Sequence, residues 1–458
     1  MKRRVAGIET EFGLVTVAGD GTQALEPEHA ARDLFKPIVA WGRSSNVFMP
    51  NAARLYLDVG SHPEYASAEC DDFWELVAQD RAGEREFHDL VTAANAAYAE
   101  QGVDARIHLL KNNADSEGSS FGSHENFMIE RRGEFTRLPQ MLVPFLVSRQ
   151  LVTGAGGVLQ GEEGPVFGFS VRADHMWETV SSATTRARPI INTRDEPHGD
   201  PTKYRRLHVI VGDSTMSELS TWLRFSMTDA VLRLVEEGHP VAAPALVDPI
   251  RDIRVIARDL TGQAPLELAD GSTTTALKLQ RFYLEAVTRA FDDLDPQMLE
   301  LWKRALEAIE TQNFSLVSRE LDWAIKHELF TTVAERRSVR LDSPEIQRLE
   351  FAYHDIDPER GVFFALQRRG LAPSILSDEQ IERARTTAPS TTRAHLRSEV
   401  LTAARAAGVD VSVDWTTVRL NRPGSKPITL LDPFETENSE VSALLDSLNA
   451  TAAEGEAP

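Results

Sequence analysis

The sequence predicts an α+β fold with an antiparallel or mixed sheet. Short segments rich in β-branched and aromatic residues, which are typical of strands, are separated by longer segments with apolar residues at helical spacing. These segments do not follow the regular strand–helix–strand alternation of a Rossmann fold. The residue pattern also changes near Pro389, which indicates a small additional domain at the C-terminal end.

Strands and helices are mixed over the first half of the chain. Apolar residues at helical spacing, such as Leu76, Val77, Phe87 and Leu90, predict a long helix or helix pair over residues 73–101. Strands are predicted within 1–20 and at 54–58, 105–111, 122–130, 166–170, 190–193 and 207–212, and further helices at 24–41, 138–153 and 217–238.

The second half is mostly helical before the C-terminal domain. Large apolar residues at helical spacing, including Leu301 and Trp302, predict helices within 276–329. Residues 392–407 read as a helix that ends at Gly408, and 411–420 alternate like a strand. We therefore predict a large domain, a small C-terminal domain and an acidic, flexible tail, over residues 1–389, 390–435 and 436–458 respectively.

The composition is that of an ordinary globular protein, with 458 residues of which 42% are hydrophobic. A net charge of −21 argues against nucleic-acid binding, which needs a basic surface. No apolar run is long enough to span a bilayer, and Glu9 and Glu11 interrupt what would otherwise resemble a signal peptide. The single cysteine, Cys70, rules out an intramolecular disulfide and fits a reducing cytoplasm. Together, these observations predict a cytoplasmic protein without nucleic-acid or membrane partners.

Two acidic segments near the N-terminus predict a functional site. In the first, a strand within residues 7–13, Glu9 and Glu11 lie on one face because side chains alternate along a strand. The second segment places Arg54, Tyr56 and Asp58 on one face in the same way, and Glu64 follows within a turn. A Glu-x-Glu pair alone is usually a solvated strand edge. The combination instead predicts a carboxylate-rich face around a cation, and Mg²⁺ is the natural candidate because it prefers oxygen ligands and phosphates.

An acidic face with metal ions and one arginine suits transfer of the γ-phosphoryl group of ATP to an oxygen acceptor. If the acceptor is a carboxylate, the product is an acyl phosphate that an amine can attack, and Asp58 could act as the base. Hydrolysis by zinc is the competing chemistry, but His124-Glu125-Asn126 lacks the second histidine of a His-Glu-x-x-His motif.

Several long motifs resemble the Pup ligase family of actinobacteria, which are carboxylate–amine ligases related to glutamine synthetase. The resemblance extends from about residue 1 to 435. It rests on the segments Gly-Ile-Glu-Thr-Glu-Phe-Gly at 7–13, Trp-Gly-Arg-Ser-Ser-Asn-Val-Phe at 41–48, Ala-Arg-Leu-Tyr-Leu-Asp-Val-Gly-Ser-His-Pro-Glu-Tyr-Ala at 53–66, Ser-Ser-Ala-Thr-Thr-Arg at 181–186, Ile-Asn-Thr-Arg-Asp-Glu-Pro-His at 191–198 and Tyr-Arg-Arg-Leu-His-Val-Ile at 204–210.

This resemblance implies a glutamine-synthetase-like large domain with a curved, mainly antiparallel sheet that holds ATP and Mg²⁺. It implies phosphorylation of the C-terminal glutamate side chain of the small acidic modifier Pup, followed by attack of a lysine of a substrate protein. Carried over by motif, the roles are magnesium ligands for Glu9, Tyr56 and Glu64, ATP contacts for Arg54, Ser67 and Trp415, and catalytic base for Asp58. The position of Trp415 implies that the small C-terminal domain closes over the nucleotide.

Two alternatives stay open at this point. One is the related enzyme Dop, which deamidates Pup and removes it from substrates; the short segment between Gly13 and Trp41 leaves no room for the long loop of Dop-like enzymes. The other is a non-catalytic adaptor for an acidic peptide, which would not need the carboxylates. Glu11 is expected near the metals. A basic groove at Arg205 and Arg206 is expected to attract Pup, and further pocket candidates, from the residue pattern alone, are His124, Asn126, Arg186, Arg194 and Arg205.

Overall fold

The computed structural model describes residues 1–458 with the exception of 59, 116–119, 132–136, 183–187, 240–242 and 456–458. The strands are β1 Ala6–Glu11, β2 Gly13–Val17, β3 Asn46–Phe48, β4 Arg54–Leu57, β5 Pro63–Ala66, β6 Arg106–Leu110, β7 Ser123–Glu130, β8 Gly157–Gly161, β9 Gly164–Gly168, β10 Glu178–Ser181, β11 Pro189–Asn192, β12 Tyr204–Val209, β13 Leu266–Glu267, β14 Thr273–Thr274, β15 Val411–Asp414, β16 Thr417–Leu420 and β17 Ile428–Thr429. The α-helices are α1 Pro27–Leu34, α2 Lys36–Gly42, α3 Phe73–Gln101, α4 Arg137–Ser148, α5 Gln150–Thr153, α6 Glu218–Glu236, α7 Pro249–Arg258, α8 Ala276–Ala290, α9 Pro296–Glu310, α10 Asp322–Arg337, α11 Pro344–His354, α12 Val362–Arg368, α13 Asp378–Thr386, α14 Ala394–Ala406 and α15 Ser439–Gly455.

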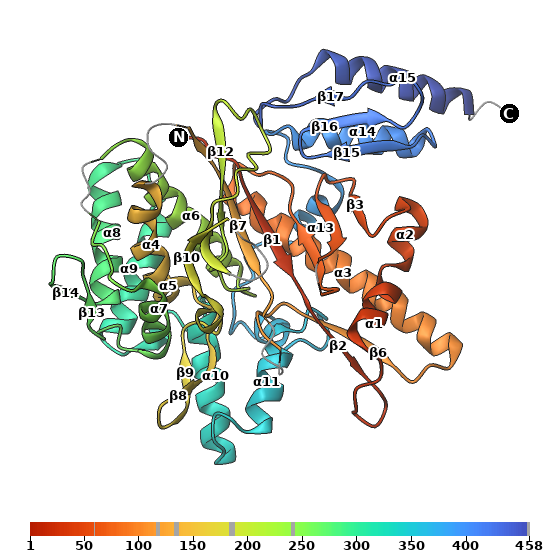
Figure 1. The fold of residues 1–458 in the computed structure, drawn as a ribbon. Coiled ribbons are helices and arrows are strands. Elements are labelled where there is room, and N and C mark those ends of the chain that lie inside the picture. The colour runs from red at the N-terminus through yellow and green to blue at the C-terminus, as the bar shows by residue number, and fades with distance from the viewer. Residues whose placement is uncertain (59, 116–119, 132–136, 183–187, 240–242, 456–458) are drawn as a thin grey trace.

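A sheet of eight strands runs through the middle of the molecule (Figure 1). Its order is β10-β11-β12-β7-β1-β5-β4-β3, and every neighbouring pair is antiparallel except β10 with β11. Helices α3, α4 and α6 contact its strands. The prediction of an α+β fold with a mainly antiparallel sheet packed by helices is therefore confirmed.

Helix α3 agrees with the range predicted from apolar spacing. It begins where the Asp72 carboxylate accepts a hydrogen bond from the Glu75 N–H at 2.8 Å, and it ends at Gly102, whose φ of +68° is easily reached only by glycine. The helix lies behind β1, and its Asp80 accepts a hydrogen bond from the Thr10 hydroxyl at 2.9 Å. A long helix with well-defined ends thus supports the strand that carries Glu9 and Glu11.

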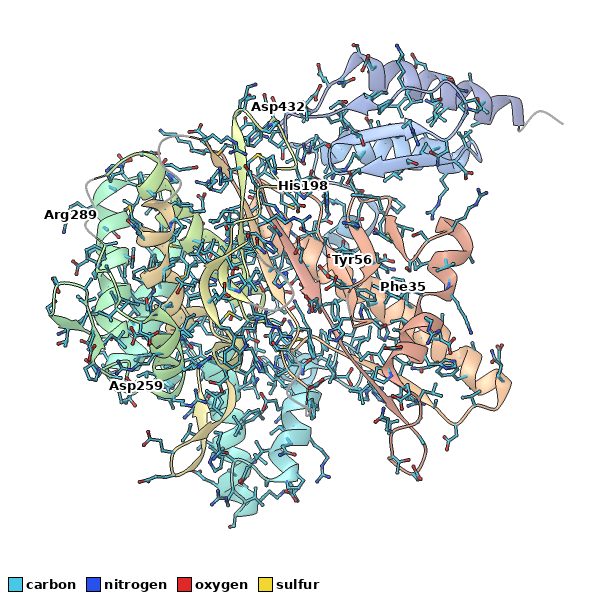
Figure 2. All side chains as sticks on the ribbon, viewed as in Figure 1. Phe35, Tyr56, His198, Asp259, Arg289 and Asp432 are labelled. Carbon is cyan, nitrogen blue, oxygen red and sulfur yellow. The ribbon has the colours of Figure 1, made fainter. Side chains whose placement is uncertain are left out.

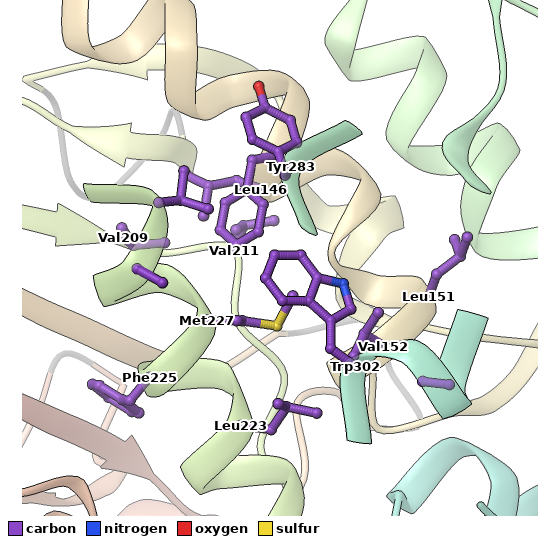
Figure 3. Packing of buried hydrophobic residues seen from close by; sticks show 14 of the residues in the cluster. Leu146, Leu151, Val152, Val209, Val211, Leu223, Phe225, Met227, Tyr283 and Trp302 are labelled. Carbon is purple, nitrogen blue, oxygen red and sulfur yellow. The ribbon is translucent and has the colours of Figure 1, made fainter. Parts of the chain in front are cut away.

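The main hydrophobic core fills the space between the sheet and helices α4 to α9 (Figure 3). Trp302 and Tyr283 lie at its centre, and both are fully buried. Their polar ends are satisfied, because the Trp302 indole donates to Gln280 at 3.1 Å and the Tyr283 hydroxyl donates to the Met141 carbonyl at 2.6 Å. Burial of such rings contributes ~3–5 kcal/mol each, which makes this core the main support of the sheet.

The helix-facing side of the sheet also carries a buried charge. Glu125 on β7 lies opposite Ile8 and is completely buried. Arg149 binds both of its carboxylate oxygens, at 2.8 and 2.6 Å, and donates to the Thr228 hydroxyl at 2.6 Å. A buried charge needs such pairing, and Arg149 supplies it on this face.

The C-terminal elements form a lobe above the sheet, blue in Figure 1. Helices α14 and α15 and strands β15 to β17 share a small core of their own, made of Leu396, Val400, Val418, Leu430 and Val441. The expected strand over 411–420 is instead the hairpin of β15 and β16, with Trp415 and Thr416 in its turn. The boundary at residue 389 stays a prediction.

The prediction of a flexible tail from residue 436 is wrong for residues 439–455, which form α15. Val441 and Leu448 are buried, and Leu444 and Leu445 pack beside them. These four residues lie three, four and seven positions apart, which is the spacing of one helix face. Among the described residues, no helix combines the length and apolarity needed to cross a membrane.

Candidate active site

The pairing of the central strands brings the predicted site residues onto one face of the sheet. Glu9 pairs with His124, Glu11 pairs with Glu64, and Glu64 also pairs with Tyr56. Directly opposite residues of antiparallel strands project to the same side, so these five side chains share one face. The face predicted from strand alternation is therefore assembled from β1, β4, β5 and β7.

Glu9 lies at the centre of this face and is held by groups from β7 and β12. Its two carboxylate oxygens lie 3.2 Å from His124 Nδ1 and 3.5 Å from His208 Nε2, and 3.1 Å from Asn126 Nδ2 and 3.6 Å from Arg206 Nη1. Burial alone would raise the pKa of Glu9, but the neighbouring His124 and His208 rings lower that pKa well below its ordinary value. Glu9 is therefore an ionised carboxylate, and with the two histidines it forms a group that could hold a metal ion.

A second group of carboxylates lies at the end of β1. Glu11, Asp58 and Glu64 each place one oxygen within 4.8 Å of the others. Burial, followed by the charges of Glu9 and Glu11, raises the pKa of Glu64 well above its ordinary value. Ionised carboxylates this close repel one another unless a cation lies among them. Their all-oxygen donor set fits Mg²⁺.

Glu64 lies in β5 rather than in the loop that the sequence predicted, and Asp58 is the first residue after β4. The intervening turn is closed by hydrogen bonds from the Asp58 N–H to the His62 carbonyl and from the Ser61 N–H to the Asp58 carbonyl, both at 2.9 Å. Ser61 has a φ of +63°, a left-handed conformation that is uncommon for a residue with a side chain. This tight turn brings Asp58 next to Glu64.

Tyr56 and Arg54 extend the site along β4 (Figure 2 labels Tyr56). The Tyr56 hydroxyl donates a hydrogen bond to Glu64 Oε1. Burial, together with the neighbouring Glu64 charge, raises the pKa of Tyr56 above its ordinary value, so the phenol keeps its proton. The Arg54 guanidinium lies 4.7 Å from the centre of the Tyr56 ring, and its Nε donates to Asn46 at 2.7 Å.

A cavity lies between this face and the C-terminal lobe. Its lining includes Glu9, Ser67, Arg206, His198 and Trp415. Trp415 packs edge-on against Phe48, with ring centres 5.0 Å apart. The cavity is therefore closed on one side by the lobe, and its use as the nucleotide site stays a prediction.

Ser67 is buried, and its hydroxyl is engaged with the main chain. Its Oγ accepts a hydrogen bond from the Ile8 N–H at 3.1 Å and donates to the Ala68 carbonyl at 3.0 Å. A hydroxyl oxygen has two acceptor sites, so one of them is still available to a donor in the cavity.

The arginines predicted from the sequence do not lie together in the structure. Arg206 lines the cavity, whereas Arg205 pairs with Asp195 at 3.6 Å, and the two neighbours project to opposite faces of β12. Arg194 is exposed and pairs with Glu196 at 2.7 Å. The remaining candidate, Arg186, lies outside the described residues. Arg205 and Arg206 therefore do not form one continuous basic groove.

Sequence reasoning missed His208 and His198 as parts of this region. His208 lies two residues after Arg206, so it shares its face, and this alternation was a visible signal. His198 lies in the loop below the C-terminal lobe, where no regular pattern marks it (Figure 2).

Comparison with known proteins identifies the family. The family model described as Pup-ligase protein matches residues 4–419. This chain belongs to the Pup-ligase family. It is 63% identical to the Pup–protein ligase of Brachybacterium faecium over 99% of this chain and 98% of that protein, and 50% identical to that of Mycolicibacterium smegmatis over 98% and 100%.

Two solved structures of the family are also similar to this one. The complex of the prokaryotic ubiquitin-like protein Pup with its ligase PafA matches with a TM-score of 0.94 at 42% identity, over 99% of this chain and 94% of that chain. PafA in complex with ADP matches with a TM-score of 0.85 at 42% identity, over 94% and 95%. These names favour the ligase over the deamidase and the adaptor that the sequence left open.

Proposed function

We propose that this protein is a Pup–protein ligase that uses ATP and Mg²⁺ to join the C-terminal glutamate side chain of Pup to lysines of substrate proteins. The observation that carries this proposal is the carboxylate group of Glu11, Asp58 and Glu64 next to a cavity closed by Trp415. Membership of the Pup-ligase family, together with relatives that bind Pup and ADP, supports it. The single buried cysteine, Cys70, agrees with a cytoplasmic location.

The magnesium ligands proposed are Glu9, Tyr56 and Glu64. Glu9 is ionised in its histidine-rich surroundings, and both carboxylates face the same side of the sheet. When bound, Mg²⁺ would offset the charge of the triphosphate. Tyr56 contributes by donating to Glu64, which fixes the direction of that carboxylate.

The nucleotide contacts proposed are Arg54, Ser67 and Trp415. Arg54 is held over the Tyr56 ring and can approach the phosphates. The Ser67 oxygen can accept a hydrogen bond from a ribose hydroxyl or from the adenine amino group. Trp415 presents an aromatic ring at the cavity wall, where a purine base can stack.

The proposed reaction has two steps. An oxygen of the Pup glutamate side chain attacks the γ-phosphorus of ATP, ADP leaves, and a γ-glutamyl phosphate forms. The lysine nitrogen then attacks the acyl carbon, and phosphate leaves with that oxygen while the isopeptide bond forms. Asp58 takes a proton from the lysine ammonium, which is otherwise protonated at neutral pH because its solution pKa is near ~10.4.

One gel assay tests this function. The protein is incubated with ATP, Mg²⁺, a lysine-bearing acceptor and either Pup ending in glutamate or Pup ending in glutamine. Conjugation of the glutamate form alone, with release of ADP, is expected. Conversion of the glutamine form to glutamate, or removal of Pup from a preformed conjugate without net ATP use, would instead assign a Dop-like hydrolase.

A further inference from the structure

Glu69 is a buried residue of the cavity wall, and the proposed reaction gives it no role. It lies two residues after Ser67, it lines the cavity, and its side chain is only 11% exposed. Arg393 Nε lies 3.0 Å and Arg397 Nη1 lies 2.8 Å from Glu69 Oε1, and Arg397 Nη2 binds the other oxygen. One carboxylate therefore holds two buried arginines of the C-terminal lobe.

The two arginines also donate hydrogen bonds to main-chain carbonyls in the walls of the cavity. Arg393 donates to the His198 carbonyl, and it also donates to the Leu430 carbonyl at 2.8 Å. Arg397 donates to the Trp415 carbonyl at 2.9 Å, and its guanidinium lies 5.4 Å from the centre of the Trp415 ring. The main chain of both His198 and Trp415 is thus fixed by a group bound to Glu69.

The backbone conformation of His198 depends on the contacts that hold its main chain. Its φ is +44°, which is strained for a residue with a side chain and persists only where neighbouring contacts hold it. Its ring lies 6.2 Å from that of Trp415, so the two form one side of the cavity. A change in the position of either arginine would move this wall.

We propose that Glu69 is a positioning residue of the nucleotide site, acting through Arg393 and Arg397 on His198 and Trp415. This inference rests on the proposed function, because it takes the cavity to be the place where ATP binds. Without the Glu69 charge, the two arginines are like charges in a buried space that have lost the carboxylate bound to both of them. They separate, and the His198–Trp415 wall loses its shape.

The test is a double-mutant cycle on ATP affinity, measured by calorimetry with Mg²⁺ and without Pup. Glu69→Gln is expected to weaken ATP binding roughly tenfold or more, since it removes charge-assisted hydrogen bonds. In a Trp415→Ala background the same change is expected to cost less than about twofold, because the wall it positions is already missing. Pup affinity is expected to stay within about twofold of wild type, which a general loss of structure would not allow.

Glu399→Gln is the matched control, since Glu399 lies on α14 with Arg397, has 42% of its side chain exposed and pairs only loosely with His395. Unchanged ATP affinity in folded Glu69→Gln, additive losses in the cycle, or an equal loss of Pup affinity would overturn the proposal. If Glu69→Gln does not fold, Glu69→Asp keeps the charge and must show a smaller loss with the same non-additivity. A wild-type protein that does not bind ATP would refute the proposed function instead.

Discussion

Replacement of Tyr56 by phenylalanine tests whether the Tyr56 hydroxyl orients Glu64 for binding of Mg²⁺. Tyr56 lies directly opposite Glu64, and its hydroxyl donates to Glu64 Oε1. The substitution removes only this oxygen, since the ring and its contact with the Arg54 guanidinium at 4.7 Å can remain. Glu64 then loses the donor that fixes its direction.

The size of the effect follows from this hydrogen bond. Mg²⁺ would bind the ionised form of Glu64, and a hydrogen bond to a charged group is worth ~1.5–3 kcal/mol, which corresponds to roughly a 10- to 100-fold change in affinity. We therefore expect the Mg²⁺ concentration for half-maximal ligation to rise by roughly 10- to 100-fold in Tyr56→Phe. The rate at saturating Mg²⁺ should recover most of the wild-type value, because Asp58 and Arg54 are untouched.

The assay is the initial rate of Pup conjugation at fixed ATP over a series of Mg²⁺ concentrations. Tyr204→Phe is the control, since Tyr204 lies at the start of β12, outside the carboxylate group. An unchanged Mg²⁺ dependence, or a loss of rate that no Mg²⁺ concentration restores, would refute the assignment of Tyr56 to the orientation of Glu64.

Four further outcomes are expected. Asp58→Asn should bind ATP normally in calorimetry but ligate at least ~100-fold more slowly, since a general base contributes ~10²–10⁴-fold; substantial ligation would remove Asp58 from that role. Trp415→Ala should raise KM for ATP roughly tenfold with little change in kcat, because stacking of a base on an aromatic ring is worth ~1–3 kcal/mol; a loss of kcat at unchanged KM would contradict this. Leu448→Ala, at a side chain only 2% exposed, should lower the free energy of unfolding in denaturant by ~2–4 kcal/mol; equal stability would mean that α15 does not pack on the lobe. Despite burial, Arg397 and Arg393 lower the pKa of Glu69 from 4.5 to about 2. The ionised carboxylate therefore stabilises the fold above about pH 4.5, and this contribution is lost as the pH falls towards 2, so the thermal midpoint of Glu69→Gln should fall less steeply over this range than that of wild type.

Strand alternation alone predicted which residues of each acidic segment face the same side. Glu9 and Glu11 in β1 and Arg54 and Tyr56 in β4 follow a period of two, and this period does not depend on the rest of the fold. Glu64 was predicted to follow Asp58 within a turn, but it lies in a strand that begins at Pro63. Proline is in fact tolerated at the first position of a strand, which is where β5 begins.

The register between distant strands could not be predicted from local patterns. His208 reaches Glu9 only because β12 pairs with β7 and β7 pairs with β1. The same limit applies to the contact of Glu69 with Arg393, which are far apart in the chain. Such pairings depend on the packing of the whole sheet and lobe, because any strand pattern fits several neighbours.

Two errors in the C-terminal lobe have local causes. The segment around Trp415 has no glycine or proline to mark its turn, so the hairpin of β15 and β16 appeared as one strand. Helix α15 was taken for a tail because of its acidic and small residues. The helical spacing of Val441, Leu444 and Leu448 was visible in the sequence and was the better guide.

The central claim is that the Pup glutamate is activated as an acyl phosphate, and one isotope measurement tests it most directly. Pup carrying ¹⁸O in the side-chain carboxylate of its C-terminal glutamate is conjugated to an acceptor lysine, and the released phosphate is examined by mass spectrometry. Transfer of one ¹⁸O to phosphate for each isopeptide bond is predicted, because the attacking carboxylate oxygen leaves with the phosphoryl group. Phosphate without ¹⁸O, formed alongside conjugate, would contradict the account.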